Sequence, residues 1–134
     1  MTTGIQVVFD CADPNQLATF WAAALGYRLQ DPPEGFTSWQ DWLREQGIPE
    51  DHWNDASAVV DPDGGRPRIY FQRVPEAKTV KNRVHLDLHV GRERREDEVA
   101  RLLGLGATEL HRASQGPFEW VTLADTEGNE FCVA

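Results

Sequence analysis

The segment from Arg83 to Val90 carries the polar side chains of this chain that are best suited to chemistry. It reads Arg-Val-His-Leu-Asp-Leu-His-Val, a strict alternation of polar and apolar residues. Because successive side chains of a strand point to opposite faces, His85, Asp87 and His89 share one face. The candidate catalytic residues are His85, as a general base, and Asp87, which with His89 forms a carboxylate–imidazole pair that can move protons near neutral pH. A salt bridge between Asp87 and His89 at the rim of a site is the alternative use of this stripe.

Capping and periodicity place the elements around this segment. Asp13 is the expected N-cap of a helix with Pro14 in its first turn and Gly26 at its end. Ser38 opens a second, short helix that ends at Gly47. The remaining signals predict strands at 4–11, 27–30, 57–60, 68–74, 83–90, 107–111, 118–123 and 129–133, and a third helix near 93–103 with Val99, Leu102 and Leu103 on its inner face.

This order of elements repeats. Each half reads strand, helix and three strands, and the punctuation recurs: Leu25-Gly26-Tyr27 matches Leu105-Gly106-Ala107, and Asp61-Pro62-Asp63-Gly64 matches Asp125-Thr126-Glu127-Gly128. The repeat predicts an α+β fold of two βαβββ modules within one domain. The predicted boundaries are a domain 1–134, module one 4–74 with an insertion 31–54, a connector 75–82 and module two 83–134.

Composition narrows the functional classes. The chain has 134 residues, enough for a core without disulfide or metal staples, and a net charge of −9 that argues against nucleic acid as a partner. No apolar run is long enough to span a bilayer, and no signal pattern stands at the N-terminus, so we expect no membrane partner. Two cysteines form no disulfide framework, which favours a reduced, cytoplasmic protein.

Several motifs together resemble the vicinal oxygen chelate superfamily, and within it the glyoxalase-like and bleomycin-resistance-like proteins. The resemblance spans nearly the whole chain outside the insertion. It implies two sheets that form a curved cup around a small-molecule site, often in a homodimer. The motifs that carry it are Asp13-Pro14, Phe20-Trp21, Leu25-Gly26-Tyr27, Val84-His85-Leu86-Asp87-Leu88, Leu123-Ala124-Asp125 and Glu127-Gly128-Asn129-Glu130-Phe131-Cys132-Val133.

The resemblance also implies where a metal would bind. Metal-using members take ligands from the first and last strands of each module, and these positions fall on Gln6, Gln72, His85 and Cys132. The family's enzymes use carboxylates at the last-strand positions, where this chain has an amide and a thiol. An amide is a weak ligand and has no useful pKa for proton transfer, so we expect neither glyoxalase activity nor a metal cofactor. If a metal is bound, these four residues are its expected ligands.

Both His85 and Cys132 leave two interpretations open. His85 is either a metal ligand or general base, or a cavity-lining histidine hydrogen-bonded to Cys132 if the first and last strands of a module pair. Cys132 is either a nucleophile or, as is usual in apolar strands, an inert or ligand-contacting thiol. Cys11 has the opposite parity to Gln6 and is expected beneath a helix.

The tryptophans fall into two groups. Trp21 lies on the buried helix face, whereas Trp39, Trp42 and Trp53 crowd the insertion, where they form a lid over the ligand, a dimer contact or an anchor for the loop. We favour a lid, and we expect Trp120 to line the cup. The predicted ligand-binding residues are Gln6, Gln72, His85, Cys132, Trp120, Trp39 and Trp42.

The sequence therefore predicts a protein that binds a small, planar or partly apolar organic molecule without the intact family metal site. Two other classes stay open. One is a lyase, isomerase or dioxygenase of the same superfamily with an unusual set of metal ligands. The other is a protein–protein module whose cup is filled by its own side chains.

Overall fold

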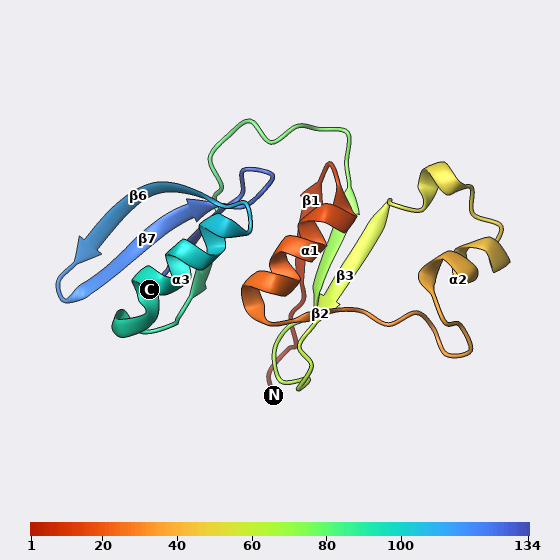
Figure 1. Ribbon diagram of the computed structural model, residues 1–134, viewed down its shortest axis with the longest axis horizontal. Helices are drawn as coiled ribbons and strands as arrows, with labels where there is room; N and C mark the ends of the chain where they lie inside the picture. The colour runs from red at the N-terminus through yellow and green to blue at the C-terminus, as the bar shows by residue number, and fades with distance from the viewer. The chain divides into compact units, whose positions relative to one another are not determined.

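A computed structural model describes residues 1–134, which form two compact units, Met1–Ala77 and Lys78–Ala134. Figure 1 shows the elements of both units. None of the helices has the length and apolar character needed to cross a membrane.

The first unit is a four-stranded mixed sheet with the order β1-β4-β3-β2. Strands β1 and β4 are parallel, whereas the pairs β4–β3 and β3–β2 are antiparallel. Helix α1 packs over β3 and β4 (Figure 1). The elements are β1 (Val7–Cys11), α1 (Pro14–Leu25), β2 (Arg28–Leu29), α2 (Trp39–Glu45), the short 3-10 helix η1 (Glu50–His52), β3 (Ala56–Val60) and β4 (Ile69–Arg73).

Aromatic side chains fill the core between this sheet and α1. Phe9 stacks on Trp21 at 5.3 Å and on Phe71 at 5.6 Å between ring centroids. Trp21 and Phe71 are fully buried, and Cys11 is buried on the same side of β1, beneath the helix, as its parity predicts. The face of β1 that carries Gln6 is therefore the face turned away from α1.

The predicted caps of the first two helices are confirmed. The Asp13 carboxylate accepts a hydrogen bond from the backbone N–H of Gln16 at 3.2 Å, and Gly26 ends α1 with a φ of 70°. Ser38 accepts from the backbone N–H of Asp41 at the start of α2. Local side-chain chemistry thus fixes both helix starts.

The second unit repeats the first. Its sheet has the order β5-β8-β7-β6, with β5 and β8 parallel and the other pairs antiparallel. Because the order matches β1-β4-β3-β2 element for element, the prediction of two βαβββ modules is confirmed. The elements are β5 (Leu86–Leu88), α3 (Arg92–Gly104), β6 (Thr108–Gln115), β7 (Phe118–Ala124) and β8 (Glu130–Val133).

Helix α3 covers one face of this second sheet and closes a smaller core. Val99 and Leu102 are buried on the helix, and α3 packs against β8, where Phe131 and Val133 are fully buried. Leu103 is 40% exposed, so its predicted place on the inner face is wrong. The two buried residues of α3, Val99 and Leu102, are enough to cover the short strand β8.

Strand β5 is shorter than the predicted strand 83–90. Val84 is 82% exposed and does not belong to the core. The reason lies in the partner strand: β8 begins at Glu130, whose backbone N–H is bonded to the side chain of Asn82, and Asn129 is tied to the preceding turn by Asp125. The start of the alternating segment therefore has no neighbouring strand with which it can form sheet hydrogen bonds.

Candidate functional site

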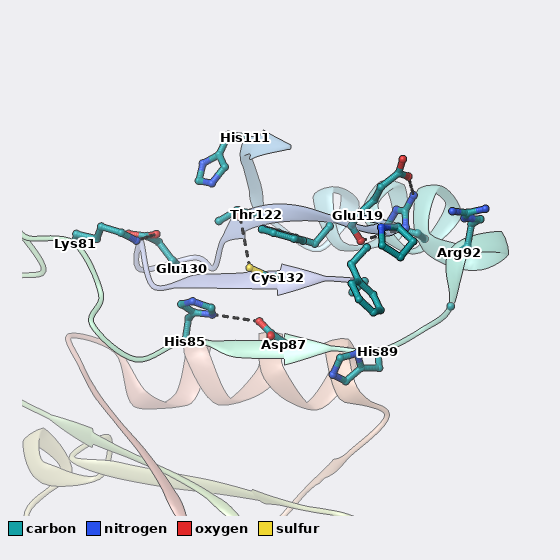
Figure 2. Close-up of a pocket in the computed structure, with 16 residues that line it drawn as sticks. Lys81, His85, Asp87, His89, Arg92, His111, Glu119, Thr122, Glu130 and Cys132 are labelled. Carbon is teal, nitrogen blue, oxygen red and sulfur yellow. Dashed lines mark hydrogen bonds and ion pairs between the residues drawn. The ribbon is translucent and has the colours of Figure 1, made fainter. Parts of the chain in front are cut away.

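A pocket of about 680 Å³ lies on the open face of the second sheet, opposite α3 (Figure 2). Side chains from β5, β6, β7 and β8, and from the start of α3, surround it. The lining residues are Lys81, His85, Asp87, His89, Gly91, Arg92, Arg95, His111, Pro117, Phe118, Glu119, Trp120, Thr122, Glu130, Cys132 and Ala134.

The floor of the pocket is one row of paired residues that crosses all four strands. Asp87 pairs with Cys132, Cys132 with Thr122, and Thr122 with His111. Residues paired across strands point to the same face, so the sheet register alone brings these four polar side chains together. Trp120 lies one same-face step along β7 and adds an aromatic wall to the row.

His85 and Asp87 contact each other at the edge of this row. The Nδ1 atom of His85 lies 3.2 Å from Oδ1 of Asp87, and both side chains are exposed to the pocket. The expected Asp87–His89 salt bridge is not formed, because Asp87 pairs with His85 instead, while His89 lines the pocket. The alternative hydrogen bond from His85 to Cys132 is also absent from the structure: the thiol contacts Thr122 at 3.4 Å.

The Cys132 thiol is buried at the bottom of the pocket. Burial raises its pKa, an effect that the nearby Asp87 carboxylate reinforces and the Thr122 hydroxyl opposes. The group is therefore a neutral thiol near pH 7 and a poor nucleophile in the free protein.

Two ion pairs neutralise charge at the pocket walls. Lys81 contacts Glu130 at 2.6 Å and lowers the pKa of that carboxyl, and Arg95 contacts Glu119 at 2.7 Å. Arg92, at the first position of α3, makes no ion pair. After pairing, the pocket holds one free guanidinium, the His85–Asp87 pair and two further histidines.

Several of the residues that line the pocket were not predicted from the sequence. His111, Phe118 and Glu119 belong to the β6–β7 hairpin, and β6 extends to Gln115 instead of the predicted end at His111. The available signal was the alternation across 118–124, which already placed Trp120 and Thr122 on one face. The irregular register between Glu109 and His111 on β6 cannot be inferred from parity.

Gln6 and Gln72 belong to the first unit, on the face of its sheet opposite α1. The Gln6 side-chain oxygen accepts from Arg68 at 3.0 Å, and Gln72 donates to Asp10 at 2.7 Å. Arg68 also donates to Gln30 and lies over the Tyr70 ring. The amide oxygen of Gln6 is thus already engaged by a cation.

The register of the first sheet identifies a different counterpart for Cys132. If Gln6 and His85 are equivalent, then Val8 corresponds to Asp87, and their partners are Tyr70 and Cys132. Gln72 lies one same-face step beyond Tyr70. It keeps the predicted face, because a two-residue offset preserves parity.

Trp39 and Trp42 lie in the insertion of the first unit and contact each other edge to face at 5.7 Å. The indole N–H of Trp39 donates to the Gln30 carbonyl at 2.8 Å, and that of Trp53 donates to the Ile48 carbonyl at 2.9 Å. These bonds tie the insertion to its own unit, which supports an anchoring role for the indoles.

The chain matches the family model described as a glyoxalase-like domain over residues 6–134. It belongs to the glyoxalase-like domain family. Membership of the vicinal oxygen chelate superfamily follows, as the motifs predicted. A comparison with curated proteins gives no match.

Solved structures share the fold of this glyoxalase-like protein at low identity. One is a mutant of the genomically encoded fosfomycin resistance protein FosX from Listeria monocytogenes, complexed with Mn(II) and 1S,2S-dihydroxypropylphosphonic acid. Its TM-score is 0.68 at 11% identity, with 99% of this chain and 90% of that chain covered.

Two further solved structures have similar TM-scores. A glyoxalase/bleomycin resistance protein/dioxygenase family enzyme from Burkholderia phytofirmans PsJN has a TM-score of 0.64 at 16% identity, over 96% of this chain and 94% of that chain. A possible glyoxalase from Bacillus cereus has a TM-score of 0.65 at 14% identity, over 98% of both chains. At these identities the likeness concerns the fold.

The donors of this glyoxalase-like protein do not suit a hard divalent cation. Such an ion prefers several oxygen ligands, whereas the polar row offers one carboxylate, Asp87, beside an imidazole and the buried thiol of Cys132. The amide of Gln6, engaged by Arg68, adds no anionic ligand.

Proposed function

We propose that this glyoxalase-like protein binds a small organic molecule with a flat, partly apolar body in the pocket of the second unit. The observation that carries the proposal is the polar row Asp87–Cys132–Thr122–His111 set beside the Trp120 ring in one hollow. Pockets that bind small molecules typically have volumes of about 300–1,000 Å³, apolar walls and a few convergent polar groups, and this pocket has the same features.

Two aromatic side chains supply the apolar surface for such a ligand. Trp120 is half-buried in the sheet, and Phe118 stands exposed at the pocket wall. An exposed phenylalanine ring leaves apolar surface in contact with water, which is unfavourable. A planar ligand stacked on the ring removes that surface from water. Arg92 at the wall and His111 in the polar row favour a ligand that also carries a hydrogen-bonding or anionic group.

The pocket argues against a pure protein–protein module. That alternative requires the hollow to be filled by the protein's own side chains, and the hollow is open. The metal-dependent enzyme of the same superfamily remains the second candidate, because His85, Asp87 and Cys132 converge and one fold neighbour, FosX, was solved with Mn(II).

We extend the proposal to the setting of the protein. A homodimer is the expected assembly on family grounds, and sedimentation or light scattering measures it directly. We also propose a reducing, cytoplasmic location, on the ground that a chain with two cysteines has no disulfide framework.

A ligand screen followed through protein stability tests the binding function. Planar aromatic acids at millimolar concentration should raise the melting temperature of the wild-type protein, because a ligand that binds only the folded state stabilises it. The F118A variant should lose the shift. The matched control is L110A, which removes an exposed leucine of β6 that does not line the pocket.

The proposal is contradicted if none of these compounds raises the melting temperature, or if wild type and F118A show equal shifts. An equal loss of the shift in L110A would show that any apolar truncation of the hairpin has the same effect, and it would remove the support for this pocket.

A further inference from the structure

The pocket of the second unit keeps two charged groups of opposite sign at separate places. One is the guanidinium of Arg92, which takes part in no ion pair, and the other is the carboxylate of Asp87, which contacts His85. Figure 2 shows Arg92 at the end of the pocket where β5 leads into α3, whereas the paired Lys81 and Glu130 stand at the opposite end. Positive and negative charge are therefore available to a ligand at different points along the pocket.

The aromatic surface of the pocket lies on the Arg92 side of the polar row. Trp120 follows Thr122 by one same-face step along β7, and Phe118 follows by a second step. Because β7 is antiparallel to β8 and β5 is parallel to β8, this is also the direction in which β5 runs from Asp87 toward Arg92. A ligand that reaches from Asp87 to Arg92 therefore passes along both rings.

We infer that the pocket binds a flat monocarboxylate whose acid group contacts Arg92 and whose opposite end carries a hydrogen-bond donor for Asp87. The ring system between these two groups lies against Trp120 and Phe118. This inference rests on the binding function proposed above, and it adds the charge of the ligand, the position of its polar groups and its orientation.

The free guanidinium favours an acid over a neutral ligand. A guanidinium is always charged, and it presents paired N–H donors that match the two oxygens of a carboxylate. The other lysine and arginine side chains that line the pocket, Lys81 and Arg95, are already neutralised by Glu130 and Glu119. One unpaired cation balances one negative charge, so a carboxylate suits the pocket better than a phosphate, which carries about 1.5 to 2 charges.

The carboxylate of Asp87 sets the orientation of such an acid. An ionised carboxylate only accepts hydrogen bonds, and its two oxygens have more acceptor positions than the contact with His85 uses. It therefore attracts a hydroxyl or amino group of the ligand and repels the ligand's own acid group. The acid group is left with the α3 end of the pocket, where Arg92 stands.

The spacing of the two rings sets the size of the ligand body. Same-face neighbours on a strand are about 7 Å apart, so Trp120 and Phe118 present their rings over a length that a fused two-ring system covers. Phe118 is 70% exposed, and contact with such a body removes its apolar surface from water. A single small ring would leave one of the two side chains uncovered.

Calorimetric titration of the full-length protein with three related ligands tests the inference. The reference ligand is a hydroxynaphthoate with its acid and hydroxyl groups at opposite ends of the ring system. Its uncharged amide should bind about tenfold more weakly, because the charge-assisted hydrogen bonds to Arg92 are lost. Naphthoate without the hydroxyl should bind about fivefold more weakly, because the hydrogen bond to Asp87 is lost.

Matched variants separate the two ends of the pocket. R92Q should reduce the affinity for the hydroxynaphthoate about tenfold and leave the affinity for its amide unchanged. R94Q is the control, because Arg94 is exposed on the same helix, does not line the pocket and gives the same change of net charge when replaced. It should leave all three affinities within about twofold of wild type, since solvent and salt screen a distant surface charge. D87A should remove the preference for the hydroxyl group and keep the preference for acid over amide.

The possible outcomes distinguish this inference from the binding function on which it rests. Equal affinities for acid and amide in wild type, or equal losses in R92Q and R94Q, would overturn the inference and leave a binding pocket in place. Persistence of the hydroxyl preference in D87A, or tighter binding of a naphthyl phosphate than of the naphthoate, would also overturn it. If neither acid nor amide binds, or if F118A binds them as wild type does, the binding function fails and the inference fails with it.

Discussion

The two histidine–aspartate pairs differ in their electrostatic situation at the level of single residues. The His52 pair lies on the surface of the first unit, where the Asp55 hydrogen bond and charge raise the pKa of His52 above its ordinary value of 6.5. The His85 pair lies beside a thiol in a pocket. The same two side chains therefore form a surface ion pair in one place and part of a candidate site in the other.

Replacing Asp55 by asparagine should lower the pKa of His52 toward 6.5, because the first cause of the raised value is the Asp55 side chain. Since the folded-state pKa is raised, the stabilisation by this pair is complete below the unfolded value and is lost as the pH rises through the folded one. An NMR titration of the His52 ring proton measures the change. An unchanged His52 midpoint in D55N contradicts the prediction.

The sequence alone does not identify which side chains contact one another in the site. Parity placed His85, Asp87 and Cys132 on the site face correctly, because alternation depends only on the strand. It could not select Asp87 as the partner of His85, or Thr122 as the partner of Cys132. Those choices depend on rotamers and on the register of neighbouring strands.

At the scale of elements, the start of α1 connects two parts of the first unit. The Asp13 carboxylate accepts from Asn54, at the end of the insertion, at 2.8 Å as well as from the helix N–H of Gln16. Asn54 in turn accepts from the backbone N–H of Asn15 at 2.9 Å. One cap thus fixes the helix start and the return of the insertion to the sheet.

The D13A variant should lose about 1 kcal/mol of stability, the usual cost of removing an N-cap. Hydrogen bonds from Asn54 and Gln16 lower the pKa of Asp13 below its ordinary value of 3.8, so this stabilisation is present above that value and is lost as the pH falls through the lowered pKa. Urea denaturation at pH 7 and at acidic pH measures both effects.

The comparison for D13A is S38A, which removes the cap of α2. Because α2 has no buried residue, its loosening should cost less global stability than the loss of the α1 cap. A larger destabilisation in S38A than in D13A would contradict the role assigned to Asp13.

Helix α3 offers a test of the narrow core of the second unit with adjacent residues. Leu102 is fully buried, whereas Leu103 is 40% exposed. L102A should cost about 2–5 kcal/mol, as truncation of a buried leucine does, and L103A less than about 0.5 kcal/mol. Denaturant unfolding of both variants measures the difference, and similar losses would place Leu103 in the core after all.

The elements whose ends are set by residues nearby in the sequence could be predicted. The elements whose ends depend on residues far along the chain could not. The helix from Pro14 to Leu25 follows from Asp13 and Gly26, which act within one turn of its ends. Strand β5 is short because Asn129 is tied to the turn before β8, about 45 residues further along the chain. In the same way, the counterpart of Cys132 is Tyr70 because of the β1–β4 register, which the motif spacing around Gly64 does not reveal.

At the scale of the whole molecule, the duplication divides the chain into two units with separate cores. The same strand order serves two faces of different composition: the first carries Gln6, Arg68 and Tyr70, and the second carries the polar row with Cys132. One fold plan therefore supplies an amide–guanidinium cluster in one module and a pocket with metal-type donors in the other.

The segment between the units is the expected point of first proteolysis. Residues 75–81 are exposed and contain no helix or strand, and exposed segments of this kind adapt to a protease more readily than ordered elements. Brief digestion with trypsin should cut first after Lys78 and yield the pieces 1–78 and 79–134, which mass spectrometry identifies. Lys81 should be cut later, because its ammonium group is paired with Glu130 of β8 at 2.6 Å, whereas that of Lys78 donates to the Val80 carbonyl within the same exposed segment.

The competing site is Arg44 in the insertion, which lies in α2 with its guanidinium 5.0 Å from the centre of the Trp53 ring. Helical structure and this stacking protect the bond after Arg44, so it should survive the first cut. The K78Q variant should move the first cut to Lys81 and slow it. An initial cut at Arg44 in wild type would mean that the insertion opens more readily than the connector, and it would contradict the anchoring of the insertion by its tryptophans.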